Sequence, residues 1–313
     1  MAAFIGRRCA AAAGALLGAL VVIFLVVRLV PGDPVLVVLG DTYTPEMYQA
    51  TQHALGVDKP LAVQLLKYIE AVLRGDFGNS FRNSKPVLPQ LLEQFPFTLC
   101  LAAIGLTIAV VVGVPAGVAS ALSRNSWMDQ SAMVIALLGI CTPSFWLGVL
   151  LMLMFSLHLD WLPTVGGGDF REPLTVLRHA LLPATTLGLA SAALIARLAR
   201  STLLEVLGQD YVRTARSKGL QERVVITRHA LRNALVPIIT VVGIDLGRML
   251  AGTTVVEILF SRPGIGHLLI NALKTRDYPL IQGAIVFYVA LIILVNTFVD
   301  VLYSVVDPRI RHA

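Results

Sequence analysis

Charged side chains are scarce in this chain. Only 14% of its 313 residues are Asp, Glu, Lys or Arg, whereas 56% are hydrophobic. A soluble domain carries about 25% charged residues and cannot hide this much apolar surface inside one core. The composition therefore predicts an integral membrane protein, and its apolar content excludes a disordered chain.

Cysteine is almost as rare, with three residues at positions 9, 100 and 141. All three lie in or beside apolar runs, where a thiol behaves as a small hydrophobic side chain. Their number excludes a secreted module held together by disulfides. We expect neither a disulfide nor a metal site from them.

The signatures of several enzyme classes are also missing. The chain has no G-x-x-x-x-G-K-[ST] phosphate-binding loop, so another subunit must perform any step driven by ATP. Its six histidines are scattered without an H-E-x-x-H pattern, and it has no G-x-S-x-G nucleophile elbow. We therefore expect no catalytic residues, no bound cofactor and no metal on this chain.

Six apolar segments are long enough to span a bilayer, which takes about 20 mostly apolar residues. They cover residues 9–30, 97–122, 131–157, 179–203, 234–258 and 279–303. Basic residues gather in the segments that would share a side with the N-terminus, and such residues mark the cytoplasmic side. The pattern predicts a multi-pass protein with both termini in the cytoplasm. Because topology explains the net charge of +6, no nucleic acid is needed as a partner.

The segment between the first two spans, residues 31–96, is much longer than an ordinary helix connection. Thr44 and Pro45 predict the start of a short helix, which Gly56 would end. A second helix with apolar residues at helical spacing is expected between Pro60 and Gly75. Its apolar stripe either packs on the membrane helices or docks an external partner.

The loop at residues 204–233 predicts another short helix. Asp210 is a plausible N-cap, Tyr211–Lys218 form about two turns, and Gly219 suits the left-handed residue after a helix. The helix carries Arg213, Arg216 and Lys218. It either lies against anionic lipid or inserts into a groove of a soluble protein.

Charges inside membrane spans are costly and often functional. Asp245 and Arg248 stand three residues apart on one helix and can neutralise each other, either as a structural pair or as part of a path. Asn296 and Asp300 stand one turn apart on the last span, and we favour a role in helix packing for them. Glu257, near the end of its span, is expected to face water.

At this point the sequence resembles a known family, the permeases of the peptide and nickel class of ABC importers, and within them the first of two permease subunits. The likeness runs through nearly the whole chain in the family's order. It rests on RLVPGDP at 28–34, LGVDKPL at 55–61, RGDFG at 74–78, PSFWLG at 143–148, DYVRTARSKGL at 210–220, LRNALVP at 231–237, RPGIG at 262–266 and RDYP at 276–279.

The resemblance implies an all-α fold with six transmembrane helices, the type I ABC importer permease fold. It implies a cytoplasmic end and first helix at 1–30, a helical periplasmic insertion at 31–96, a five-helix core at 97–303 with a coupling loop at 204–233, and a cytoplasmic tail at 304–313. The expected location is the bacterial inner membrane.

The resemblance also gives the short helix the role of a coupling helix that contacts the ATPase. Ala215 and Gly219 fall on the Ala and Gly of the family's E-A-A-x-x-x-G signature, whereas Arg213 stands in place of its Glu and Thr214 in place of its first Ala. The contact residues implied are Tyr211, Arg213, Thr214, Ala215, Arg216, Lys218, Gly219 and Leu220.

The implied partners are a second homologous permease, two ATP-binding subunits that use ATP and Mg, a periplasmic substrate-binding protein and the lipid bilayer. The expected function is to form half of a path for small peptides, including glutathione-like ones. A permease for nickel or a nickel chelate is the alternative within the family. A self-sufficient secondary transporter or channel is the alternative of another class.

Overall fold

The computed structural model describes residues 2–29, 33–40 and 43–306. Most of the expected tail, residues 307–313, lies outside this part, as does residue 30 at the end of the first expected span. The chain forms two compact units, and each of them combines segments that lie far apart in the sequence. The first combines residues 1–96 with 263–297, and the second combines 97–262 with 298–313.

Every long regular element in the described part of the chain is helical, which confirms the all-α fold. The first unit holds α1 (Ala2–Leu29), α2 (Pro34–Leu39), α3 (Pro45–Leu55), α4 (Leu61–Leu73), the start of α5 (Val87–Leu122), α12 (Ile265–Thr275) and most of α13 (Tyr278–Val306). The second unit holds the rest of α5, α6 (Trp127–Cys141), α7 (Ser144–Leu151), the π-helix η1 (Met152–His158), α8 (Pro173–Leu207), α9 (Asp210–Ser217), α10 (Glu222–Val224), the π-helix η2 (Val225–Leu231) and α11 (Arg232–Leu259).

Five of the described helices are long and apolar enough to cross a membrane, and up to six spans result if one bent pair counts as a single span. The bent pair corresponds to the third expected segment, 131–157. The structure interrupts this segment between α6 and α7, with a bend of 105°. Pro143 explains the break, because proline has no N–H to donate and forces the residue before it out of the helical region. Thr142 is accordingly extended, at φ −78° and ψ 124°.

In the first unit, the two short helices form where the sequence predicts them. Thr44 accepts a hydrogen bond from the N–H of Met47 at 3.3 Å and so caps α3, while Gly56 ends that helix in the left-handed region. On α4, Ile69 and Val72 pack against a buried cluster that α1 and α13 contribute. This contact confirms the expectation that α4 packs on membrane helices.

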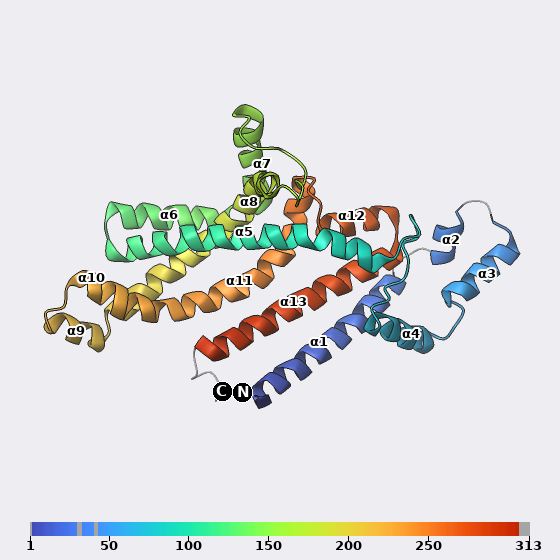
Figure 1. The fold of residues 1–313 in the computed structure, drawn as a ribbon, viewed down its shortest axis with the longest axis horizontal. Helices are drawn as coiled ribbons and strands as arrows, with labels where there is room; N and C mark the ends of the chain where they lie inside the picture. Colours follow the sequence, from blue (N-terminus) through green and yellow to red (C-terminus); the bar gives the residue numbers. More distant parts are fainter. Residues whose placement is uncertain (1, 30–32, 41–42, 307–313) are drawn as a thin grey trace. The chain divides into compact units, whose positions relative to one another are not determined.

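In the second unit, α8 is the central helix, with α5, α6, α7 and α11 packed around it (Figure 1). Glycines allow α5 and α8 to approach closely, as small residues do in membrane helix pairs. A Cβ atom on Gly117 would lie 2.3 Å from the carbonyl oxygen of Ala196, and one on Gly113 would lie 2.6 Å from that of Ala192. The backbones themselves are therefore in contact along this pair.

Candidate functional site

The short helix α9 follows directly on α8, from which only Gly208 and Gln209 separate it. It is strongly amphipathic. Val212 and Ala215 are buried, with 0% and 6% of their surface exposed, and they pack against Val225 of η2. One face of α9 thus rests on the chain's own helices, and Figure 1 shows α9 and α10 together beyond the ends of α8 and α11.

The structure confirms the predicted end of α9 but not its predicted N-cap. Gly219 adopts the left-handed conformation, at φ +74°, so this prediction is confirmed. The predicted N-cap is wrong by one position: Asp210 is the first helical residue, and Gln209 precedes it without a side-chain capping bond. The Asp210 carboxylate lies 3.5 Å from the Arg213 guanidinium, so it pairs along the helix and does not cap its own N-terminus.

Two side-chain contacts tie α9 to the segment that follows it. The amide of Asn233, on α11, donates a hydrogen bond to the hydroxyl of Tyr211 at 2.9 Å. Arg216 donates two hydrogen bonds to the Glu222 carboxylate, at 2.6 and 3.1 Å. That carboxylate raises the pKa of Arg216 above its ordinary value, because it stabilises the charged guanidinium. The helix is therefore held from its buried face and from both ends.

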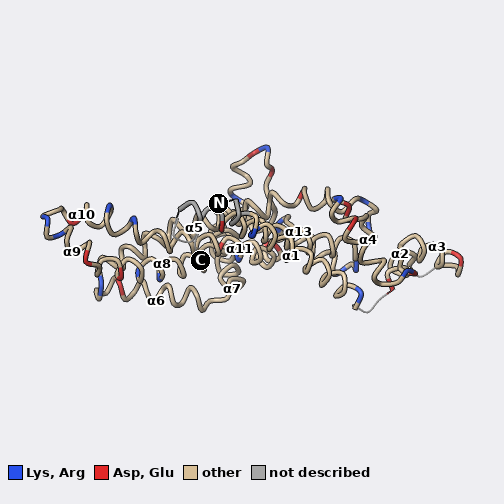
Figure 2. Tube along the Cα trace, turned by 90° about the horizontal axis from the view of Figure 1, so that it is seen from below, with Lys and Arg blue, Asp and Glu red and all other residues tan. Residues whose placement is uncertain are grey.

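The remaining members of the predicted coupling set are exposed. They are Tyr211, Arg213, Thr214, Arg216, Lys218, Gly219 and Leu220. Ala215 differs from them because it is buried, and its contacts are with the chain itself. Figure 2 shows basic and acidic residues gathered at α9 and α10, while the long helices of the same unit are mostly uncharged. The exposed face thus combines a tyrosine, a leucine and several cations.

The predicted pair within α11 shares a face, as its spacing requires, but its members lie in different surroundings. The Asp245 side chain is 5% exposed and that of Arg248 is 70% exposed, with 3.9 Å between their nearest charged atoms. The second carboxylate oxygen of Asp245 has no hydrogen-bond partner among the described residues. The two residues thus form a long ion pair, in which the other carboxylate oxygen of Asp245 takes no part.

The other predicted pair lies on α13. Asn296 is exposed and Asp300 is half-buried. The boundary between the two units falls between Thr297 and Phe298, so these two residues belong to different units although they are one helical turn apart.

Two polar clusters of the second unit were not foreseen from the sequence. Asp129, at the start of α6, accepts hydrogen bonds from Arg200 of α8 at 2.6 and 2.7 Å, and it also accepts from the hydroxyl of Ser120 on α5. No local pattern reveals this contact, because the two charged partners stand 71 positions apart in the chain.

The second cluster corrects the expectation for Glu257. This residue does not face water: it is 0% exposed and accepts a hydrogen bond from the hydroxyl of Thr98 at 2.7 Å. The helix end is covered by other parts of the unit, which hydropathy alone cannot show. Arg262 is equally buried beyond the end of α11, and burial lowers its pKa because a charged guanidinium loses its hydration there.

Comparison with known families decides what kind of protein carries this helix. Residues 113–312 match the family described as "Binding-protein-dependent transport system inner membrane component", and residues 1–102 match the N-terminal family of the same membrane component. The first match alone covers more than half of the chain. The chain belongs to this family of transport permeases. The expected resemblance is thereby confirmed, and the permease is a multi-pass protein of the inner membrane.

Relatives of known naming align with the permease over nearly its full length. A putative peptide transport system permease protein of Brucella abortus is 41% identical, and the alignment covers 100% of both chains. A di/tripeptide transport system permease protein of Pseudomonas aeruginosa is 42% identical, over 100% of this chain and 99% of the relative. A glutathione transport system permease protein of Salmonella paratyphi A is 42% identical over 93% of each chain.

Solved structures confirm the fold of the permease. A chain of the MetNI methionine ABC transporter in an inward-facing conformation superposes with a TM-score of 0.61 at 17% identity, covering 72% of this chain and 99% of the other. A chain of an amino acid ABC transporter gives a TM-score of 0.51 at 17% identity, covering 71% and 94%. These similarities establish the type I importer permease fold.

Proposed function

We propose that this permease forms half of the translocation path of an ATP-driven importer for short peptides, and that α9 is the helix through which the ATPase acts on it. The observation that carries this proposal is the way in which α9 packs on the rest of the chain. One face is fixed on the chain by Val212 and Ala215, and the opposite face is exposed. When the ATPase moves a helix packed in this way, the movement is passed on to α8 and α11.

The proposed contact surface consists of the exposed residues of the predicted set, with Tyr211 and Leu220 as apolar contacts and Arg213 and Lys218 as cations. Ala215 has a different role in this proposal, because it seats the helix on Val225. Nucleotide binding can shift the permease between two states only if the ATPase contacts α9 differently in each state.

The proposed assembly contains a second homologous permease, two ATP-binding subunits that hold ATP and Mg, and a periplasmic substrate-binding protein. In this arrangement both termini and residues 204–233 face the cytoplasm, and residues 31–96 form a periplasmic insertion. The concentration of basic residues around α9 supports that orientation, since loops with many Lys and Arg stay inside.

The insertion also offers a surface to the binding protein. On α4, Leu61, Leu66 and Leu73 remain 58%, 68% and 68% exposed, whereas Ile69 and Val72 pack on the chain. Exposed apolar groups at a water-facing site favour contact with another protein. We propose α4 as part of the docking surface for the binding protein.

Within the membrane we assign Asp245, Arg248, Asn296 and Asp300 to the path or to its lining helices. Asp245 supports this assignment best, because one oxygen of its buried carboxylate has no partner among the described residues. A second subunit, a substrate or water would complete its hydrogen bonding.

The substrate class follows from the relatives, whose names refer to peptides, di/tripeptides and glutathione. Calorimetry on the cognate binding protein tests it, with Ala-Ala, Ala-Ala-Ala, glutathione and Ni²⁺ as separate titrants. Saturable binding of the two alanine peptides supports the proposal. Binding of glutathione alone, or of Ni²⁺ alone, would replace it with that substrate.

Cysteine cross-linking tests the role of α9. We expect Leu220→Cys to form a disulfide with a cysteine placed in the ATPase groove. The rate of disulfide formation should change when ATP is added. Ala215→Cys is the matched control on the buried face and should not cross-link. Equal cross-linking of both variants, or of neither at any groove position, would contradict the assignment.

A further inference from the structure

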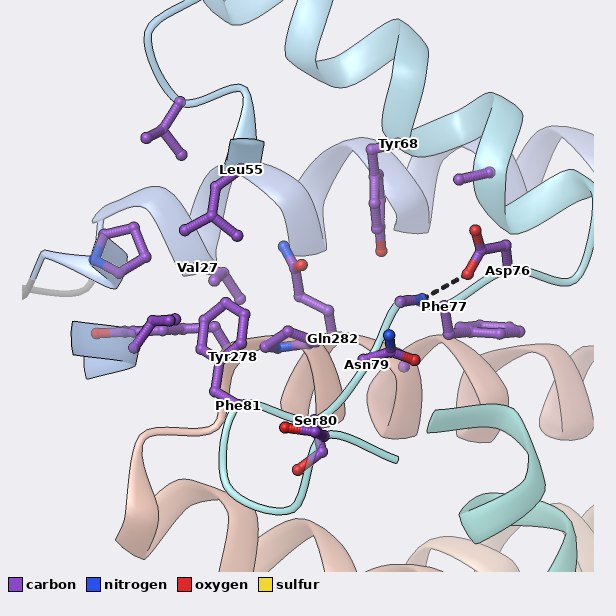
Figure 3. A pocket seen from close by; sticks show the side chains of 18 of the residues that line it. Val27, Leu55, Tyr68, Asp76, Phe77, Asn79, Ser80, Phe81, Tyr278 and Gln282 are labelled. Atoms are coloured by element: carbon purple, nitrogen blue, oxygen red, sulfur yellow. Dashed lines mark hydrogen bonds between the residues drawn. The ribbon is translucent and has the colours of Figure 1, made fainter. Parts of the chain in front are cut away.

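The first unit contains a cavity of about 670 Å³ that the transport mechanism above does not use (Figure 3). Its wall combines the C-terminal turn of α1, the N-terminal turn of α13, the α3–α4 region and the segment of residues 76–84. The cavity falls within the range of about 300–1,000 Å³ that is typical of small-molecule sites.

The wall of this cavity is fixed in place. Asp277, only 1% exposed, accepts hydrogen bonds from the hydroxyl of Ser80 and from the N–H of Phe81, the latter at 3.1 Å. These bonds join residues 76–84 to the start of α13. The cavity is therefore bounded by a buried polar anchor and is not a gap beside a loose loop.

Two phenol groups line the cavity, those of Tyr68 and Tyr278. Tyr278 is 8% exposed, and neither its hydroxyl nor that of Tyr68 has a partner among the described residues. Burial raises the pKa of Tyr68 to about 12, so its hydroxyl remains a donor at neutral pH. A buried hydroxyl without a partner is unfavourable, and an occupant with acceptor groups would satisfy it. In Figure 3 the Gln282 side chain extends from α13 into the same space as the Tyr68 hydroxyl.

The cavity also carries one charge of each sign, from Arg28 and Asp76. The Arg28 guanidinium lies over the ring of Phe24, 5.4 Å from its centre. The Asp76 carboxylate accepts a hydrogen bond from the N–H of Gly78 at 2.8 Å. A site with one cation and one anion suits a ligand that itself bears both charges.

The mixed wall distinguishes between two kinds of amphipathic occupant. Val27, Leu55 and Phe77 provide apolar surface, but the Tyr68 hydroxyl and Gln282 lie among them (Figure 3). A lipid acyl chain would leave these polar groups unpaired, at a cost. A peptide places backbone donors and acceptors along its length and apolar side chains between them.

We propose that this cavity binds a short peptide of the size of the transported substrate, with its carboxylate toward Arg28, its ammonium group toward Asp76, and its backbone bonded to Tyr68 and Gln282. The proposal rests on the proposed function, because it adds a peptide site on the permease itself. That site would hold substrate after the binding protein has released it.

Equilibrium binding of radiolabelled Ala-Ala to the complete importer in nanodiscs, without the binding protein, tests the site. We expect saturable binding, which Tyr68→Phe weakens about three- to tenfold by removing one hydroxyl. Arg28→Gln should weaken it similarly, and N-acetyl-Ala-Ala should bind less well than Ala-Ala because it lacks the ammonium group. Tyr43→Phe is the matched control, since Tyr43 is exposed and lies outside the cavity lining.

Three results would overturn the proposal. They are no saturable binding at about 10 mM peptide, binding that Tyr68→Phe leaves unchanged, and co-purified phospholipid that is lost specifically in Tyr68→Phe. Uptake driven by ATP and the binding protein is measured on the same preparation. If uptake of Ala-Ala occurs but the permease binds none, only the cavity assignment fails. If uptake is absent, the proposed function itself is contradicted.

Discussion

At the scale of single residues, Asp129 is the centre of a group of polar contacts in the second unit. Its carboxylate is 3% exposed and receives a two-pronged contact from Arg200, together with the Ser120 hydroxyl and the N–H of Asn125. Paired hydrogen bonds of this kind are stronger and more specific than single ones. The contact fixes α5, α6 and α8 to one another.

Asp129→Asn is therefore expected to destabilise the permease strongly. It leaves the Arg200 guanidinium without its anion, and breaking such a pair costs about 3 kcal/mol. The thermal unfolding midpoint of the purified chain in detergent should fall clearly. Glu70→Gln is the control, because the Glu70–Arg74 pair is exposed on both sides and contributes little. Equal midpoints for the two variants would contradict this role of Asp129.

The polar clusters also show what could not be read from the sequence at this scale. Local spacing identified Asp245 and Arg248 as neighbours, because they share one helix. It could not identify Asp129 with Arg200, or Thr98 with Glu257, because those partners meet only after distant helices pack. Exposure is likewise a property of packing, which is why Glu257 was expected to face water.

At the scale of elements, the closest helix contact predicts a large effect of small changes. Gly117→Leu would place side-chain atoms where the Ala196 carbonyl and the Ala199 side chain lie. Leucine would push α5 away from α8, which should lower the free energy of unfolding by about 3 kcal/mol or more, because the backbones of packed helices cannot shift freely. Thermal unfolding of the purified chain measures this loss.

Gly18→Leu is the matched control for this substitution. A Cβ on Gly18 of α1 meets nothing within 4 Å, so its midpoint should stay close to that of the unsubstituted chain. An unchanged midpoint for Gly117→Leu would show that α5 and α8 are not in such close contact.

The end of α9 gives a second prediction at this scale. Gly219→Val should reduce ATP-dependent uptake severalfold while the protein still inserts, because valine is strained at φ +74°. A side chain at this position meets nothing within 4 Å in the chain itself, so the strain does not come from a clash. Gly219→Asn separates backbone strain from the presence of a side chain, because asparagine adds a side chain but tolerates the left-handed region.

We expect Gly219→Asn to retain more uptake than Gly219→Val if the backbone shape is what matters. If both variants transport as well as the unsubstituted permease, the shape of this turn does not contribute to coupling. Membrane insertion, checked by the yield of the chain in the membrane fraction, must be equal for all three proteins.

Most elements were predictable, since their signals are local. The caps at Thr44 and Gly56, the stripe of α4 and the turn at Gly219 all depend on residues that are close in the chain. Hydropathy located the spans but not their shape. It gave no sign that Pro143 would divide one apolar segment into two helices at 105°.

At the scale of the whole molecule, the chain is organised in two units that hydropathy could not predict. Residues 263–297 belong with the N-terminal part, and α13 continues from one unit into the other. Hydropathy counts apolar segments in order along the chain, whereas the partner of each segment depends on side-chain fit. The family resemblance implied the fold correctly because it reflects the complete arrangement.

The distribution of charge also acquires meaning at this scale. A net charge of +6 first indicated only a membrane protein with basic loops. The structure places a group of these residues on and beside α9, where a partner with complementary charge would meet them. The charge thus supports the proposed contact with an ATPase.

Uptake of radiolabelled Ala-Ala into proteoliposomes tests the central claim most directly. One preparation contains this chain alone, and the other contains the second permease and both ATPase subunits as well, with the binding protein added outside. We predict uptake only in the complete preparation and only with ATP inside. Uptake by the chain alone without ATP would contradict the account and identify a self-sufficient transporter or channel.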